Sequence, residues 1–79
     1  MYKSLLIDTE RLFEIVEEPD TGLKRLIVTI PSVGWKDIHF RITDDEYALA
    51  RSKAETFYDL VDRLALDKGT HFYVDRLLK

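Results

Sequence analysis

The sequence predicts an α+β domain in which one long helix covers one face of a mostly antiparallel sheet of three or four strands. Three observations lead to this prediction: a turn between two apolar segments, a segment of alternating apolar and polar side chains, and a long amphipathic segment that opens with a capping box. The expected order of elements is β-β-β-α-β. With 79 residues there is room for one hydrophobic core, so we expect a single domain over residues 1–79.

A β-hairpin is expected over residues 11–30. Its arms, residues 11–18 and 23–30, flank a Pro-Asp-Thr-Gly turn at residues 19–22. In such a turn proline presets φ, aspartate bonds forward to the backbone and glycine accepts a positive φ. The second arm is rich in β-branched residues and too short for a typical helix. The first arm also fits a short helix, and residues 4–7 either extend it or form a strand of their own.

The clearest strand signal follows a loop at residues 31–35. Over residues 37–42, three large apolar side chains alternate with Asp37, His39 and Arg41. This period of two indicates a strand with one face on the core and the other nearer to water. We therefore expect the polar side chains of this strand on the sheet face that points away from the core.

The long helix is expected over about residues 44–67. Thr43 and Glu46 have the spacing of a capping box, in which each side chain accepts a hydrogen bond from the backbone N–H of the other residue. Asp44 and Asp45 add negative charge to the first turn, where the helix dipole favours it. Apolar residues then recur every three or four positions, which predicts one continuous buried stripe.

Beyond this helix the sequence predicts a stop and a last strand. Lys68 supplies a basic last turn and Gly69 a position for left-handed backbone. Residues 70–75 carry apolar side chains at alternate positions and are expected to form the fourth strand. Residues 76–79 either continue that strand or form a helical stub.

No segment carries a catalytic, metal-binding or cofactor-binding signature. His39 and His71 would approach each other if their strands were adjacent, but the sequence has no cysteine and no histidine pair at metal-ligand spacing. Ser32 lacks the G-x-S-x-G context of a nucleophile turn. We expect no catalytic residue, no metal and no cofactor. A small metal-dependent enzyme centred on His39 and His71 is the weakest alternative.

The charge balance argues against nucleic acid as a partner. The chain has 12 basic and 15 acidic residues, a net charge of −3, and thus no basic excess to attract phosphates. No apolar run approaches the roughly 20 residues of a membrane-spanning helix. The absence of cysteine favours a reducing compartment. These features predict a cytoplasmic protein that binds neither nucleic acid nor membranes.

By elimination, the sequence favours a non-enzymatic, small acidic protein-binding module, for example an inhibitor or immunity-type protein that neutralises a basic partner. The alternative is a homodimeric structural or ligand-binding subunit that buries the open sheet face, because small domains often gain stability from a second subunit. The expected contact residues are carboxylates of the hairpin, the tryptophan of the loop, and side chains on the sheet face opposite the helix: Glu14, Glu17, Glu18, Asp20, Trp35, His39, Arg41 and Tyr73.

Overall fold

The computed structural model describes residues 2–31, 34–68, 71 and 73–78. In chain order the elements are β1 (Lys3–Asp8), β2 (Phe13–Glu17), β3 (Lys24–Ile30), β4 (Lys36–Ile42), α1 (Asp44–Arg51), α2 (Glu55–Asp67), the 3₁₀ turn η2 (Val74–Arg76) and β5 (Leu77–Leu78). The strands form one antiparallel sheet in the order β1-β2-β3-β4-β5. The predicted α+β class is confirmed.

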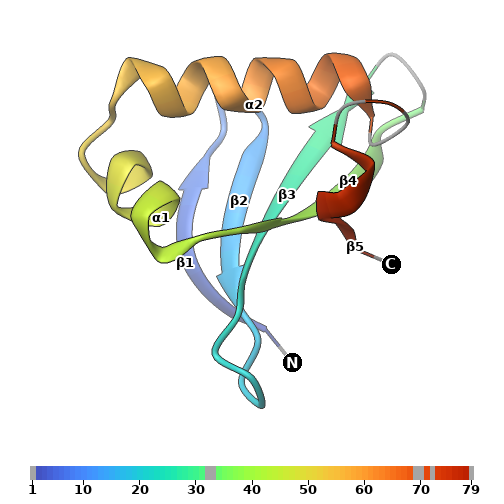
Figure 1. The fold of residues 1–79 in the computed structure, drawn as a ribbon. Helices are drawn as coiled ribbons and strands as arrows, with labels where there is room; N and C mark the ends of the chain where they lie inside the picture. Colours follow the sequence, from blue (N-terminus) through green and yellow to red (C-terminus); the bar gives the residue numbers. More distant parts are fainter. Residues whose placement is uncertain (1, 32–33, 69–70, 72, 79) are drawn as a thin grey trace.

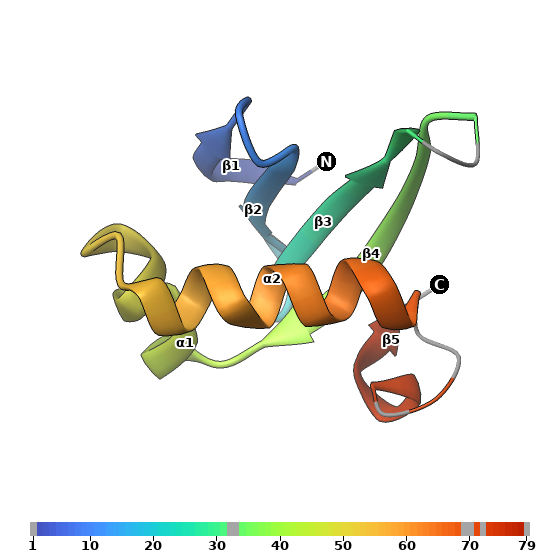
Figure 2. The same cartoon turned by 90° about the horizontal axis from the view of Figure 1, so that it is seen from above.

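The two helices lie on one face of the sheet, with α2 running across the strands (Figures 1 and 2). Alternate strand positions point towards the helices, so Ile15, Leu26 and Phe40, which are neighbours in the pairing register, are all fully buried. The core between the two layers consists of the following residues: Phe13, Ile15, Leu26, Val28, Ile30, Ile38, Phe40, Ile42, Ala50, Phe57, Val61 and Leu64.

The hairpin is present, and its first arm is a strand, not a short helix. β2 and β3 pair from Phe13–Val28 to Glu17–Lys24. The Pro-Asp-Thr-Gly turn is closed by the N–H of Gly22, which donates to the carbonyl of Glu18 at 2.9 Å. Gly22 has a φ of 72°, the left-handed value for which glycine was expected.

The sheet has five strands, one or two more than predicted. Residues 3–8 form a strand of their own, and the last strand is Leu77–Leu78 instead of residues 70–75. Residues 70 and 72 of the predicted strand lie outside the described residues. The Asp67 carboxylate accepts hydrogen bonds from the N–H groups of His71 and Tyr73, at 3.3 and 3.2 Å, and so turns the chain before it can extend along β4.

The predicted helix over residues 44–67 is two helices. Lys53 adopts a left-handed φ of 58° between them. The N–H of Lys53 donates to the carbonyl of Ala50, and the N–H of Ala54 donates to the carbonyl of Leu49, which together make a Schellman motif. A straight helix of the predicted length would measure about 36 Å, whereas the longest extent of the Cα trace is 29 Å. The break keeps both helical segments on the sheet.

The start and the end of the helical region agree better with the prediction than its middle does. The Thr43 hydroxyl accepts from the N–H of Glu46, and the Glu46 carboxylate accepts from the N–H of Thr43, so the predicted capping box is confirmed. At the other end, Lys68 has the left-handed φ of 55°. The predicted left-handed position, Gly69, lies outside the described residues.

Candidate functional site: the outer face of the sheet

The side of the sheet that points away from α1 and α2, which we call the outer face, is the best candidate surface. One row of directly paired residues, the central row, crosses the five strands on this face: Ile7, Glu14, Ile27, His39 and Leu78. No helix or strand of the described residues covers it. The central row therefore presents three apolar and two polar side chains to the surroundings.

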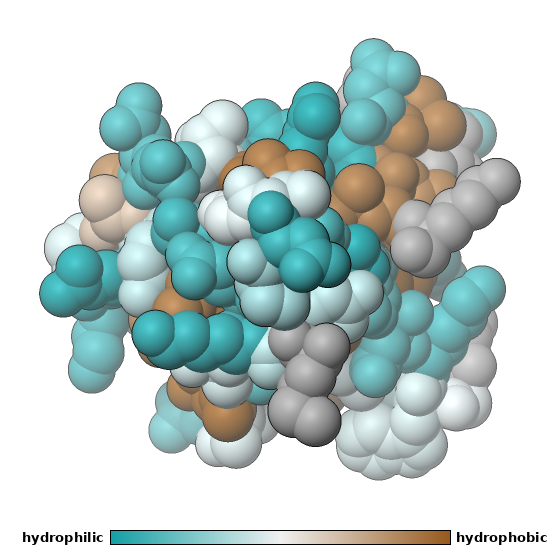
Figure 3. Space-filling view, turned by 90° about the horizontal axis from the view of Figure 1, so that it is seen from below, coloured by the Kyte–Doolittle hydropathy of each residue, from teal (hydrophilic) through white to brown (hydrophobic). Residues whose placement is uncertain are grey.

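The apolar members of the central row are accessible to different degrees. Ile7 is 62% exposed, while Ile27 and Leu78 are half-buried. A hollow of about 250 Å³ lies beside Ile7 and Ile27, and Glu14 and Thr29 also line it. Figure 3 shows the molecule from this side. Hydrophobic side chains (brown) gather on the right of the view, the side on which β5 lies in Figure 2, and hydrophilic side chains (teal) surround them.

Next to the central row, a buried arginine is held by a polar cluster. Only 8% of Arg25 is exposed. Its guanidinium donates to the Glu18 carboxylate from Nη2 at 2.5 Å and from Nε at 3.2 Å, and from Nη1 to His39 Nδ1 at 3.0 Å. The Tyr2 ring lies 4.8 Å from the guanidinium carbon. These contacts satisfy the buried charge, which would otherwise be costly to remove from water.

Burial and the contacts with Arg25 shift the pKa values of His39 and Glu18. Burial, together with the charge of Arg25, lowers the pKa of His39 from its ordinary value of 6.5, although Asp37 opposes this shift. Because a guanidinium only donates, Nδ1 of His39 is an acceptor and the proton of the neutral ring lies on Nε2. The hydrogen bond from Arg25 lowers the pKa of Glu18 from 4.5. The outer face thus presents an N–H donor at His39 and an ionised Glu18.

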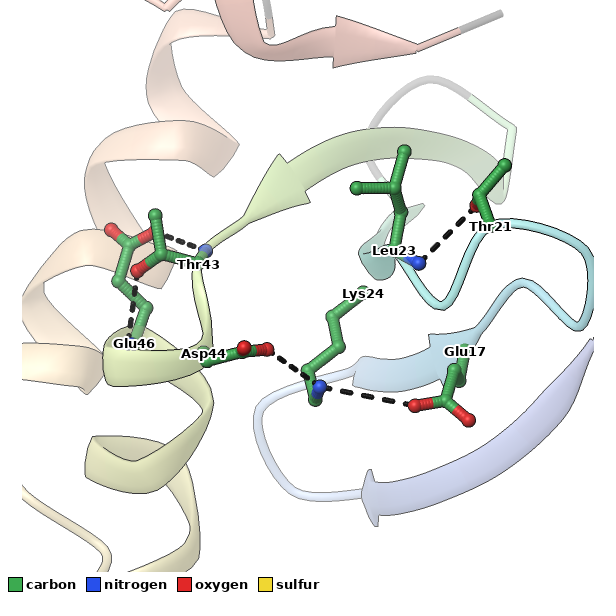
Figure 4. Close-up of polar contacts among 7 residues, drawn as sticks. All are labelled: Glu17, Thr21, Leu23, Lys24, Thr43, Asp44 and Glu46. Carbon is green, nitrogen blue, oxygen red and sulfur yellow. Dashed lines mark hydrogen bonds and ion pairs between the residues drawn. The ribbon is translucent and has the colours of Figure 1, made fainter.

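The contact residues expected from the sequence do not all lie together. Glu14, His39 and Arg41 are on the outer face, as the pairing register requires. Glu18 follows β2 and joins them through its hydrogen bonds with Arg25. Glu17 lies on the other side and is 3.8 Å from Lys24 Nζ, which also bonds Asp44 at 2.6 Å; Figure 4 shows this lysine between the two carboxylates.

The remaining three predicted residues are scattered. Asp20 is exposed at the hairpin turn, and Trp35 is 68% exposed in the loop between β3 and β4. Tyr73 packs against the hydrophobic core, so its expected place on the outer face is wrong. A strand over residues 70–75 would turn Tyr73 away from the core, but the last strand is Leu77–Leu78 and Tyr73 precedes η2.

Three residues at the outer face, Ile7, Leu78 and Tyr2, were not among the contact residues predicted from the sequence. Ile7 and Leu78 belong to segments for which the sequence leaves two structures open, and Tyr2 precedes the first of these segments. The register shift between Ser4 and Leu6 interrupts the alternation of β1, so periodicity alone does not mark Ile7. β5 has only two residues, too few to show any period.

The described residues contain neither a cluster of metal ligands nor a membrane-spanning helix. They contain no group of three or more histidine, cysteine, aspartate or glutamate side chains that could hold a metal ion. None of their helices is long and apolar enough to cross a membrane. Nδ1 of His39 forms its hydrogen bond with Arg25, whose guanidinium does not bind metal ions.

Comparison with protein-family models, with curated proteins and with solved structures found no match to this chain.

Proposed function

We propose that this chain is a non-enzymatic protein-binding module that contacts its partner through the outer face of the sheet. One observation carries the proposal: the central row places the apolar side chains of Ile7, Ile27 and Leu78 in line on a sheet face that no described element covers. Isolated apolar residues on a surface are common. An aligned set with polar neighbours is typical of a contact surface, where an apolar centre is surrounded by hydrogen-bonding groups.

The Arg25 cluster supports this proposal because it fixes the polar part of the surface in advance. Arg25 is bound from three sides, by Glu18, His39 and Tyr2. Side chains that are already ordered lose less conformational freedom when a partner binds. Flat sheet surfaces with ordered polar groups suit proteins better than small ligands, which favour deep and enclosed pockets.

A basic partner remains the finer form of this proposal, and the ion pairs narrow the residues that would serve it. Glu17 and Glu18 are paired within the chain to Lys24 and Arg25. Among the described residues, no ion pair involves Glu14 or Asp20. Of the four hairpin carboxylates, these two are therefore the ones whose charge is available to a cationic partner.

The proposal is tested by comparing proteins recovered from the source lysate with two single variants. Ile7→Asp places a charge on the outer face, and Leu66→Asp places the same charge on α2, where Leu66 is 83% exposed. Both positions tolerate a polar side chain because both are largely in water. We expect Ile7→Asp to lose a protein that the unmodified chain and Leu66→Asp both retain. Equal recovery by both variants, measured by quantitative mass spectrometry, would overturn the proposal.

A further inference from the structure

We infer that the outer face binds a second copy of this chain, related by a two-fold axis that runs along β3. The inference rests on the proposed function, since it names the occupant of the same face, and it replaces the basic partner with a second copy of this chain. Two observations carry it: the central row is symmetric about Ile27 in its apolar members, and its two polar members, Glu14 and His39, are complementary. A 79-residue domain also gains more than a large one from a second subunit.

The geometry follows from the strand order. A rotation of 180° about β3 places β3 of one copy against β3 of the other, β2 against β4 and β1 against β5. In the central row, Ile27 then meets Ile27 of the second copy. Ile7 meets Leu78 of the second copy. Stacked sheets lie about 10 Å apart with their strands nearly aligned, so the side chains of the two outer faces would interdigitate.

The polar members of the row meet in the same rotation. Glu14 of each copy faces His39 of the other, which gives two equivalent contacts. Since His39 Nδ1 accepts from Arg25 at 3.0 Å, its Nε2–H is the group that points away from the arginine. The carboxylate of Glu14, which has no ion pair among the described residues, is a matching acceptor.

The charge of Glu14 favours an axis along β3 over an axis that runs across the strands. A two-fold axis through Ile27 that runs across the strands would place every residue of the central row against its own copy. Glu14 would then face Glu14, and the two carboxylates would repel each other in a partly dehydrated interface. The axis along β3 avoids this repulsion.

Close contact between the two copies ends at the neighbouring row of the outer face, which contains Arg25. There the rotation brings Arg25 of one copy towards Arg25 of the other. Each guanidinium is neutralised by Glu18, and the Tyr2 ring lies 4.8 Å from its carbon atom. The tyrosine rings would therefore separate the two arginines, and the interface centres on Ile27.

Sedimentation velocity of the unmodified chain is the first test. At about 100 µM, a complex with a dissociation constant near 1 µM is almost fully formed, so we expect a dimer. Ile27→Lys places two like charges on the axis and should yield a monomer, while Leu66→Lys on α2 should leave the dimer intact. A monomeric unmodified chain at this concentration would refute the inference.

Thiol cross-linking locates the axis, because the sequence has no cysteine. A short bifunctional reagent is needed, since sheets lie about 10 Å apart and a direct disulfide requires Cα atoms within about 7 Å. With the axis along β3, Ile7→Cys should cross-link to Leu78→Cys in a mixture of the two variants, and neither variant should cross-link alone. Homotypic cross-linking of Ile7→Cys would contradict this axis.

A charge exchange tests the Glu14–His39 contact. His39→Glu sets two carboxylates against each other and should weaken the dimer at least tenfold. The double variant Glu14→Lys/His39→Glu should recover most of that loss, which a merely structural role for either residue would not produce. Glu14→Lys alone is measured as well. If the double variant loses as much dimerisation free energy as the two single variants together, the contact is contradicted.

The tests separate the inference from the proposed function. If the chain sediments as a monomer while Ile7→Asp still loses a protein from the lysate, the outer face binds a different protein and only the inference fails. If the chain is monomeric and Ile7→Asp changes nothing, both fail.

Discussion

On the helix side of the sheet Leu26 and Phe40 have no exposed surface, whereas their neighbours in sequence on the outer face, Ile27 and His39, are only half-buried. The same strands therefore carry two different surfaces. One is closed by α2 and stabilised by apolar burial. The other is open, and its buried arginine, Arg25, is held by hydrogen bonds with Glu18 and His39.

This difference separates the residues that stabilise the fold from those available for binding. The twelve residues of the core cluster all lie on the helix side or in the helices. Val16, which is buried on the outer face, does not belong to that cluster. Among the described side chains, no buried polar atom lacks a hydrogen-bond partner, so the polar cluster is complete without a ligand. Binding on the outer face would thus add contacts without rearranging the core.

The largest predicted effect contrasts the two faces directly. Phe40→Ala removes a fully buried ring from the helix side and should lower the free energy of unfolding by about 3–5 kcal/mol. Ile27→Ala, on the outer face of the next strand, should cost about 1 kcal/mol or less in the monomer, because Ile27 is half-buried. Urea unfolding followed by circular dichroism measures both. Similar losses at the two positions would mean that the outer face is also part of the core.

A smaller effect is expected at the start of α1, which helps to close the helix side. Thr43→Ala removes the hydroxyl that accepts from the N–H of Glu46 at 3.1 Å. Loss of such a cap lowers the free energy of unfolding by about 1 kcal/mol. Thr43→Ser keeps the hydroxyl and serves as the matched control in the same urea titration. If the two variants were equally stable, the cap would contribute nothing.

The helix side could be predicted from the sequence because its signals are periodic and local. Alternation in residues 37–42 placed Ile38, Phe40 and Ile42 correctly in the core, and the capping box placed the start of the helix at the right residue. Both patterns depend only on neighbours within a few positions.

The outer face could be predicted only in part, because two of its strands lack a regular period. β1 has a register shift between Ser4 and Leu6, so the alternation that would mark Ile7 is interrupted. The turn before η2 depends on the Asp67 carboxylate, a contact across four to six residues that periodicity does not encode. Tyr73 was misplaced for this reason.

The break between α1 and α2 was missed because a lysine occupies its left-handed position. An L-residue pays about 1 kcal/mol or more for this conformation, and glycine does not. Lys53→Gly should therefore raise the free energy of unfolding by about 0.5 kcal/mol, after allowance for the greater freedom of glycine in the unfolded chain. Lys53→Ala, which keeps the steric conflict, is the control. A loss of stability in the glycine variant would show that the lysine side chain stabilises the break.

The smallest effects are expected on the outer face as the pH falls. Burial lowers the pKa of His39 from 6.5, and the hydrogen bond from Arg25 lowers the pKa of Glu18 from 4.5. In both cases the unfolded chain binds a proton more readily than the folded chain, so stability decreases with decreasing pH. The His39 contribution begins below 6.5 and the Glu18 contribution below 4.5.

Two variants separate these contributions in thermal unfolding measured across this range. His39→Gln should remove the loss of stability that begins below pH 6.5 and keep the one that begins below pH 4.5. Glu18→Gln should do the reverse. The effects should be small because Glu18 retains contact with water at its surface position and solvent screens its pair with Arg25. On the helix side the described core has no ionisable member, so its stability should not vary with pH in this way. A pH profile that neither variant alters would show that the Arg25 cluster contributes nothing to the difference between the two faces.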